Sequence, residues 1–143
     1  EKKDIKHYNN ILSAIFNTML VGYMPDYTCL ITPIFRAMEY YLHRILGEKL
    51  GNNTERSNGS NNFAYFKRDD DASNYYYTSS RDNATDEQID FLNDLYNYYN
   101  KIRHPYAHWS KDSIDTPVIT DMNVARDLIM EGLQLVNKYY IMF

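Results

Sequence analysis

Hydrophobic residues recur at intervals of three and four in four segments of this chain, and this period constrains the fold more than any other feature. In the first segment it predicts an amphipathic helix that ends near Gly22. The hydrophobic positions of this helix are Ile5, Tyr8, Leu12, Ile15 and Met19. The second segment predicts a helix from about Thr32 to Leu50, because Thr32 suits the N-cap and Pro33 suits the first helical position.

The periodic pattern disappears after the second segment and returns in the third. Residues 51–84 are rich in Asn, Ser and Asp, which predicts a flexible insertion in which residues 63–66 form a short strand or an anchor. The third helix is expected to begin with a capping box at Thr85. Pro105 is expected to end or kink this helix close to Arg103.

A last helix is predicted from about Asp121 to the C-terminus. Four amphipathic helices predict an all-α fold, a four-helix bundle with a long irregular insertion between the second and third helices. A chain of 143 residues is expected to form one domain over residues 1–143. The chain begins with Glu rather than Met, so we expect it to be a fragment of a longer protein.

Charge and cysteine content narrow the class of protein. A net charge of −4 gives an isolated domain no general attraction to nucleic acid, so any RNA contact must come from a local patch or from further parts of the protein. The single cysteine, Cys29, excludes an internal disulfide, fits a reducing compartment and is expected to be a small core residue. The sequence shows no secretory signal and no membrane-spanning run, so we expect a cytoplasmic protein.

Residues 95–111 contain no Asp or Glu, although the chain as a whole is acidic. The cationic, imidazole and aromatic side chains of this segment are the kinds that contact phosphates and bases. The candidate RNA-binding residues are Lys101, His104, Tyr106, Trp109 and Lys111, and Tyr98 is a further stacking candidate.

Arg103 and His108 are the first candidate catalytic residues. In an unbroken helix their side chains would point about 140° apart, but a turn at Pro105 would let His108 fold back towards Arg103. Taken singly, Arg103 fits a cation at a helix C-terminus, and His108 fits a hydrogen-bonded polar residue beside Trp109. Together, in a patch without acids, they favour the binding and cleavage of a phosphodiester.

Glu39 places a carboxylate on the hydrophobic stripe of the second helix, where it needs a partner. Arg36, one turn earlier, offers an intrahelical ion pair. Alternatively, Glu39 reaches across the bundle to Arg103 or His108, where it would orient the imidazole or raise its pKa above about 6.5. No set of residues has metal-ligand spacing, so neither a metal nor a cofactor is predicted.

The run from Arg103 to His108 resembles the R-x4-H motif of HEPN domains, which are all-helical modules of many prokaryotic ribonucleases. The whole chain is similar to the C-terminal domain of RnlA/LsoA-type toxins of toxin–antitoxin systems. The order of parts agrees: a segment with Arg36 and Glu39, an insertion with aromatics, a helix that starts with DEQI, and the motif. Trp109 follows the motif here, whereas a related branch continues as H-x-Y, so inactivation by modification of that tyrosine is not expected.

The resemblance implies a metal-independent endoribonuclease that cleaves mRNA, acts as a homodimer with two motifs at one cleft, and is neutralised by a protein antitoxin. His108 would act as general acid or base, Arg103 would stabilise charge on the scissile phosphate, and Arg36 and Glu39 would complete the site. The products would carry a 2′,3′-cyclic phosphate and a 5′-hydroxyl. Two alternatives stay open: a dimerisation and antitoxin-binding module that is not catalytic as an isolated fragment, and a substrate-binding HEPN domain without activity.

Overall fold

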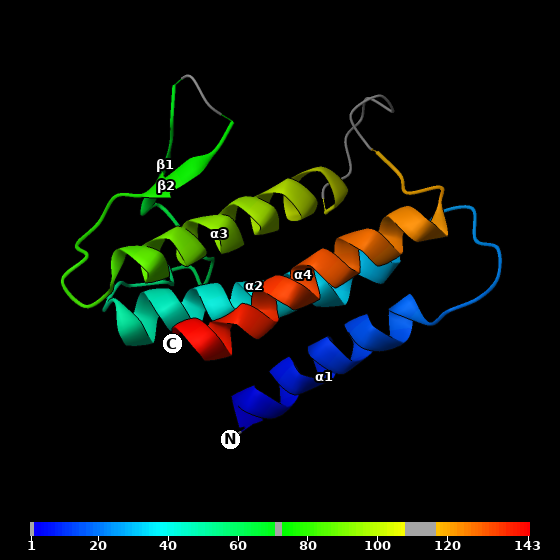
Figure 1. Ribbon diagram of the computed structural model, residues 1–143, viewed down its shortest axis with the longest axis horizontal. Helices are drawn as coiled ribbons and strands as arrows, with labels where there is room; N and C mark the ends of the chain where they lie inside the picture. Colours follow the sequence, from blue (N-terminus) through cyan, green and yellow to red (C-terminus); the bar gives the residue numbers. More distant parts are fainter. Residues whose placement is uncertain (1, 71–72, 108–116) are drawn as a thin grey trace.

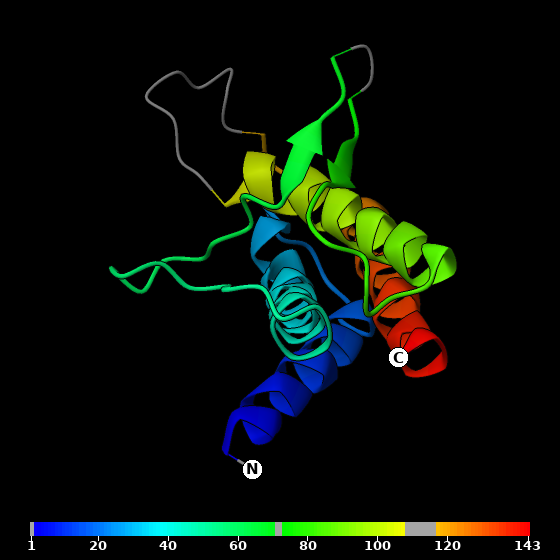
Figure 2. The ribbon, with the colours of Figure 1, turned by 90° about the vertical axis from the view of Figure 1, so that its left-hand side faces the viewer.

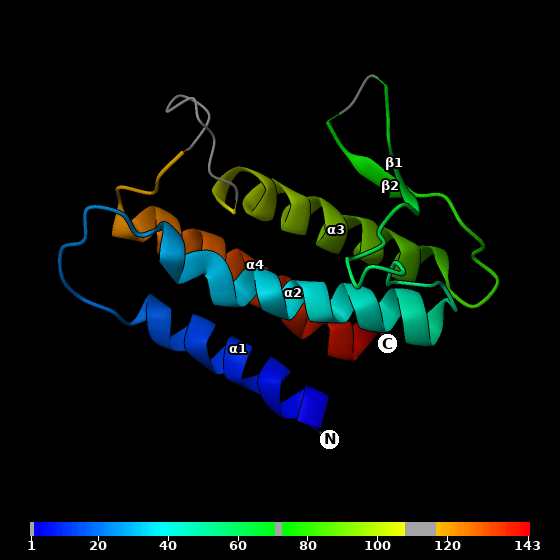
Figure 3. The ribbon, with the colours of Figure 1, turned by 180° about the vertical axis from the view of Figure 1, so that it is seen from behind.

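The computed structural model describes residues 2–70, 73–107 and 117–143, with side chains from Ile5 onwards. The α-helices of these residues are α1 (Lys2–Thr18), α2 (Thr32–Arg44), α3 (Asp86–Tyr106) and α4 (Met122–Met142). The only strands there are β1 (Phe66–Arg68) and β2 (Tyr75–Tyr77), so the prediction of an all-α fold is confirmed at this level. Figures 1 and 3 show α2 and α4 lying together, with α3 on one side of them and α1 on the other.

The hydrophobic stripe that identified α1 in the sequence lies mainly on the exposed side of this helix. Ile5, Tyr8, Ile15 and Met19 are all at least 40% exposed, whereas Ala14 is fully buried. Helix α1 therefore packs on α2 and α4 through a face that the stripe did not mark.

Helix α1 ends at Thr18, before the predicted boundary near Gly22. The Thr18 hydroxyl donates to the carbonyl of Ile15 at 2.7 Å. Arg126 of α4 donates to the carbonyls of Thr18 and Leu20, at 3.0 and 2.7 Å. An arginine from another helix thus satisfies carbonyl groups that α1 and the following turn leave unpaired.

Helix α2 begins at Thr32 as predicted, but it does not continue as one α-helix to Leu50. Beyond Arg44 it becomes the π-helical turn η2 (Ile45–Lys49), and the Leu50 N–H donates to the Ile45 carbonyl at 3.0 Å. The preceding 3-10 turn η1 (Thr28–Ile31) runs directly into α2, so Thr32 is already helical. The prediction that Thr32 is the N-cap is therefore wrong.

The second half of the insertion forms a two-stranded ribbon on α3, in which β1 and β2 pair antiparallel with Phe66 opposite Tyr77. Figure 2 shows the ribbon above α3. The side-chain oxygens of Asn93 and Asn97 in α3 accept the backbone N–H groups of Tyr77 and Tyr75, at 2.8 and 2.7 Å. An isolated ribbon is marginally stable, so these amide side chains replace part of a missing third strand.

Helix α3 begins with the predicted capping box. The Thr85 hydroxyl accepts the backbone N–H of Gln88 at 3.3 Å, and the Gln88 side chain accepts the Thr85 N–H at 3.0 Å. Both ends of this reciprocal pair were visible in the sequence because the motif is local.

Helix α3 was expected to end or kink close to Arg103; it continues through Pro105 and ends at Tyr106, three residues later. Pro105 lies in the last turn, where its missing N–H removes a single hydrogen bond to Lys101. Two residues later, the Ala107 N–H still donates to the Arg103 carbonyl at 2.9 Å. The turn that was expected to bring His108 back towards Arg103 therefore does not begin at Pro105.

The hydrophobic core fills the space between α2, α3 and α4. Tyr98 of α3, a base-stacking candidate from the sequence, is buried there, and its hydroxyl donates to the backbone carbonyl of Leu128 in α4 at 2.7 Å. Burial, more than any nearby charge, raises the pKa of the Tyr98 hydroxyl, which keeps it a donor. Tyr98 is therefore a link between two helices rather than a platform for bases.

Cys29 is exposed, so the prediction of a small core residue is wrong. It lies in η1 before Leu30 and Ile31, which are buried, and this tight turn directs neighbouring side chains to different sides. Within the described parts of the chain, no helix has the length and hydrophobicity needed to cross a membrane.

Gly132 of α4 allows α2 and α4 to approach closely. A Cβ at Gly132 would lie 2.5 Å from Cγ1 and 3.3 Å from Cδ1 of Ile34. We expect Gly132→Ala to lower the free energy of unfolding by about 1–3 kcal/mol, because Ile34 must leave its position in a packed core. Urea denaturation measures this change.

Gly47 of η2 provides the matched control for this substitution. A Cβ there would meet nothing closer than Cγ2 of Thr54, at 3.8 Å. Gly47→Ala should therefore leave stability unchanged or raise it by up to about 1 kcal/mol. Equal stabilities of the two variants would show that the helix contact at Gly132 is not tight.

Candidate functional site

The residues singled out in the sequence lie on α2 and at the end of α3, as far as they are described. Arg36 and Glu39 are on α2, whereas Lys101, Arg103, His104 and Tyr106 occupy the last turns of α3. His108, Trp109 and Lys111 lie outside the described residues.

Glu39 is the centre of a polar network that joins α2, α3 and the insertion. One carboxylate oxygen accepts the hydroxyl of Tyr99 at 2.5 Å, and the other accepts the side-chain amide of Asn61 at 2.7 Å. The Nε of Arg103 lies 3.9 Å from the oxygen that Tyr99 binds. The structure thus brings Glu39 and Arg103 together across the bundle.

Tyr99 holds the Glu39 carboxylate as a permanent donor. Burial first, and then the hydrogen bond to Glu39, raise the pKa of the Tyr99 hydroxyl, because both disfavour the phenolate. The hydroxyl therefore stays protonated throughout the neutral range. The carboxylate is left with a fixed orientation and an exposed fraction of 29%.

Asn61 extends the network to a second residue of α2. Its side-chain oxygen lies 3.0 Å from Nε2 of His43, while its amide nitrogen donates to Glu39. One asparagine of the insertion thus bridges an acid and an imidazole that are one helical turn apart. Asn61 was not predicted from the sequence, because an asparagine in an Asn-rich loop carries no distinguishing pattern.

Arg103 contacts the Tyr99 ring and lies near Glu39, and neither contact is a hydrogen bond of its guanidinium. Its Cζ lies 5.8 Å from the centre of the Tyr99 ring, and 38% of its side chain is exposed. The 3.9 Å separation from Glu39 exceeds hydrogen-bonding distance, so the pair is electrostatic only. Among the described residues Arg103 makes no side-chain hydrogen bond.

Arg36 is exposed on α2 and forms no ion pair with Glu39, both residues being described. The intrahelical pair that the sequence allowed is therefore not formed. Glu39 instead takes its partners from α3 and the insertion, because the carboxylate faces the inside of the bundle. A role for Arg36 in the site stays a prediction.

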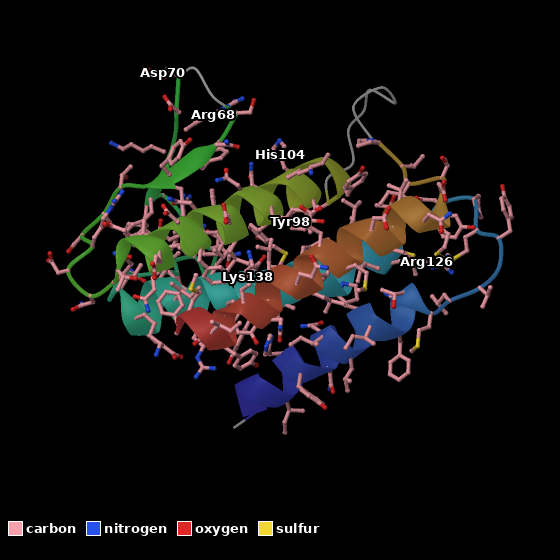
Figure 4. All side chains as sticks on the ribbon, in the orientation of Figure 1. Arg68, Asp70, Tyr98, His104, Arg126 and Lys138 are labelled. Atoms are coloured by element: carbon pink, nitrogen blue, oxygen red, sulfur yellow. The ribbon has the colours of Figure 1, made fainter. Side chains whose placement is uncertain are left out.

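The remaining described candidates lie near the C-terminal end of α3. Figure 4 shows Tyr98 on the side of α3 that faces α4, and His104 on the opposite, outer side. His104 is exposed and Tyr106 is half-buried against the core. Lys101 is exposed, with Nζ 5.6 Å from the centre of the Tyr98 ring. These cations and rings do not converge on one point with Arg103.

A cavity of about 480 Å³ opens beside Arg103. Residues 56–64 of the insertion form one of its walls, and α3 forms the other. The polar and charged residues that line it are Arg56, Ser60, Asn61, Asn100 and Arg103. No acidic side chain is among its described lining residues, so the cavity favours an anionic ligand.

Aromatic rings form the apolar part of the same cavity. Phe63 contacts the edges of Tyr96 and Tyr99, with ring centres 6.1 and 6.0 Å apart. Tyr96 is stacked on Phe66 at 3.8 Å, which fixes its ring. Residues 63–66 were predicted to form a short strand or an anchor. They do both, since Phe63 is an anchor on the rings of α3 and Phe66 begins β1.

The described part of the site combines a carboxylate, a tyrosine hydroxyl, an amide and a guanidinium. Within the described residues no three His, Cys, Asp or Glu side chains are grouped so that they could hold a metal ion. A half-exposed guanidinium beside a fixed carboxylate can bind and orient a phosphate ester, and cleavage of the ester would need a general acid or base as well.

Comparison with known proteins identifies a solved structure with a similar fold and a family to which the chain belongs. No curated protein sequence matches the chain. Among solved structures, the fold is similar to that of the Escherichia coli toxin LsoA in complex with the T4 phage antitoxin Dmd, with a TM-score of 0.69 and 20% sequence identity. The match covers 90% of this chain and 48% of the LsoA chain, so this chain spans about half the length of LsoA.

A family model defines the group of sequences to which the chain is related. The model of the RnlA-toxin DBD domain, described as "RNase LS, bacterial toxin DBD domain", matches residues 1–110. The matched range includes all of α1 and α2, the insertion and α3. Since the match covers well over half of the sequence, the chain belongs to the RnlA-toxin DBD family of bacterial toxin domains.

Proposed function

We propose that this chain is the HEPN ribonuclease domain of a bacterial toxin, which cleaves mRNA without a metal ion and is neutralised by a protein antitoxin. The observation that carries the proposal is the contact between Glu39 and Arg103 across the bundle. The carboxylate is held by Tyr99 and Asn61, so it keeps a negative charge 3.9 Å from Nε of the arginine that begins the R-x4-H sequence.

In the proposed reaction His108 takes the proton of a ribose 2′-hydroxyl while the 2′ oxygen attacks the adjacent phosphorus. The bond from phosphorus to the 5′ oxygen breaks, and the departing oxygen takes up a proton. One product strand then ends in a 2′,3′-cyclic phosphate and the other begins with a 5′-hydroxyl. Arg103 stabilises the negative charge that develops on the phosphate oxygens.

A homodimer completes this proposal. Arg103 lies at the end of α3 and is half-exposed, so a second copy could present its own motif to the same phosphate. Two motifs at one cleft would supply the acid and the base that the reaction needs.

The proposed neutralising partner, a protein antitoxin, is suggested by a structurally similar toxin. The structurally similar toxin LsoA is described in complex with a protein antitoxin, Dmd. We propose a protein antitoxin for this chain as well. Its binding would block RNA if it covered the end of α3 or the adjacent cavity.

The first test of the proposed reaction is cleavage of mRNA by the full-length protein. We expect His108→Ala and Arg103→Ala each to lower kcat/KM by at least about a hundredfold, because each removes a group that acts in the transition state. EDTA should change neither the parent nor the variants. Lys138→Ala, an exposed lysine of α4, is the control and should keep the parent rate (Figure 4). Parent rates in both motif variants would exclude this mechanism.

Glu39→Gln tests whether the carboxylate positions the catalytic groups. The variant keeps the size of the side chain and removes its charge, so we expect kcat/KM to fall about tenfold. In the proposed site Glu39 lies near His108 and favours the imidazolium, so its loss should shift the limb of the pH profile that reports His108 to lower pH. Glu48→Gln, which changes an exposed acid of η2, is the matched control. An unshifted profile in Glu39→Gln would leave Glu39 with a structural role only.

A second candidate function, a dimerisation and antitoxin-binding module, is favoured by the exposed hydrophobic face of α1. Tyr8 and Phe16 on this face are each 61% exposed. From Ile5 to Pro25 the only formally charged residue is Lys6, and charge is depleted at the centre of protein interfaces. A helix face of this kind suits an antiparallel pair of α1 helices from two copies, which meet through the same surface.

This second function predicts that α1 controls self-association. We expect the double variant Tyr8→Ser and Phe16→Ser to raise the dimer dissociation constant by at least about tenfold, since it removes two large apolar contacts. Analytical ultracentrifugation measures the change. Tyr76→Ser is the control, because Tyr76 is an exposed aromatic on β2, at the other side of the molecule (Figure 1). Unchanged association in the double variant would exclude α1 as a dimer interface.

A further inference from the structure

The cavity beside Arg103 is bounded by a rigid turn of the insertion. The backbone N–H of Arg56 donates to the Ser60 carbonyl, and the Gly59 N–H donates to the Arg56 carbonyl, both at 2.9 Å. Gly59 has a φ of +77°, a backbone conformation that residues other than glycine rarely adopt. A bridge between Glu55 and Asn61 closes the base of this turn. The backbone of Arg56 is therefore held by hydrogen bonds within the turn, although its side chain is exposed.

Three side chains of the cavity have donor groups that are not used within the described structure. Arg56, Asn100 and Arg103 line the cavity, and none of them makes a side-chain hydrogen bond to another described residue. Asn61 and Ser60 differ, because Asn61 is bound to Glu39 and His43, and Ser60 donates to Asn58. The unused donors thus come from both walls of the cavity.

We propose that this cavity is a binding subsite for one nucleotide of single-stranded RNA, next to the phosphate that the motif cleaves. The subsite rests on the proposed function and adds to it residues outside the R-x4-H motif. Arg56 contacts a backbone phosphate adjacent to the scissile one, and the Asn100 amide contacts the edge of the base. The base lies against Phe63 and the aromatic wall.

The size of the cavity supports a single nucleotide as its occupant. Its volume of about 480 Å³ lies within the range of small-ligand pockets, which is roughly 300–1,000 Å³. Bases reach an aromatic surface only when they are unstacked, so a single strand fits and a duplex does not.

The charge of the cavity supports an anionic backbone. Two arginines line it and no acid is among its described lining residues, while Glu39 beside Arg103 is bound by Tyr99 and Asn61; the whole chain has a net charge of −4. Attraction to RNA must therefore be local. Arg56 and Arg103 come from separate segments, the insertion and α3, and both line the cavity.

The test uses the full-length protein with His108→Ala, so that the RNA is bound but not cut. Fluorescence anisotropy of a short labelled single-stranded RNA gives the dissociation constant as a function of salt. We expect Arg56→Ala to raise this constant about tenfold, since a hydrogen bond to a charged group is lost. The slope of its logarithm against the logarithm of salt should fall by about 0.7, for one phosphate contact to a single strand.

Three further arms make the test specific. Arg56→Lys should restore the salt slope but only part of the affinity, because lysine keeps the charge and loses the bidentate geometry. Asn100→Ala should weaken binding without changing the slope. Arg68→Ala, an exposed arginine of the same insertion that does not line the cavity, should behave as the parent (Figure 4). Equal effects of Arg56→Ala and Arg68→Ala, or no effect of Arg56→Ala, would overturn the subsite.

A cleavage assay with His108 intact separates this proposal from the proposed function. If the parent cuts RNA and Arg56→Ala keeps its KM, the ribonuclease function stands and the subsite is wrong. If the parent never cuts RNA but loses RNA binding in Arg56→Ala, the subsite stands and the ribonuclease function is wrong. A rise in KM that exceeds the fall in kcat for Arg56→Ala supports both.

Discussion

The carboxylate of Glu39 is the interaction on which the arrangement of the candidate site depends. A charged group on the inner side of α2 needs partners, and it finds them in Tyr99 of α3 and Asn61 of the insertion. Three separate parts of the chain are therefore joined at one point. Loss of either partner would leave one oxygen of a half-buried carboxylate without its hydrogen bond, which lowers the stability of the fold.

This network has a direct consequence for Arg103 and the cavity beside it. Because Tyr99 and Asn61 satisfy both oxygens of Glu39, Arg103 is attracted to the carboxylate without being bound by it. Asn61 also anchors the segment that carries Phe63 and the turn at Arg56. One half-buried acid thus attracts a cation that faces the cavity and holds the opposite wall of the cavity.

Predictions that depend on interactions between residues close in the sequence were correct, whereas several that depend on tertiary contacts were wrong. The capping box at Thr85 was predicted correctly, because its partners are three residues apart. Pro105 was expected to break α3, but a proline in the last turn removes one hydrogen bond and the packed helix continues past it. Tyr98 and Cys29 were assigned to the wrong environments, since composition near a residue does not show which way its side chain points.

By itself, the sequence determined the helices, their approximate boundaries, the all-α class and the residues of the R-x4-H sequence, because periodicity and caps act over a few residues. It also marked Glu39 as a carboxylate that needs a partner. Only the tertiary structure decided that this partner is Tyr99 and Asn61 rather than Arg36, and that the hydrophobic stripe of α1 faces outwards. The physical reason is that burial and pairing depend on contacts between segments far apart in the chain, which no local pattern records.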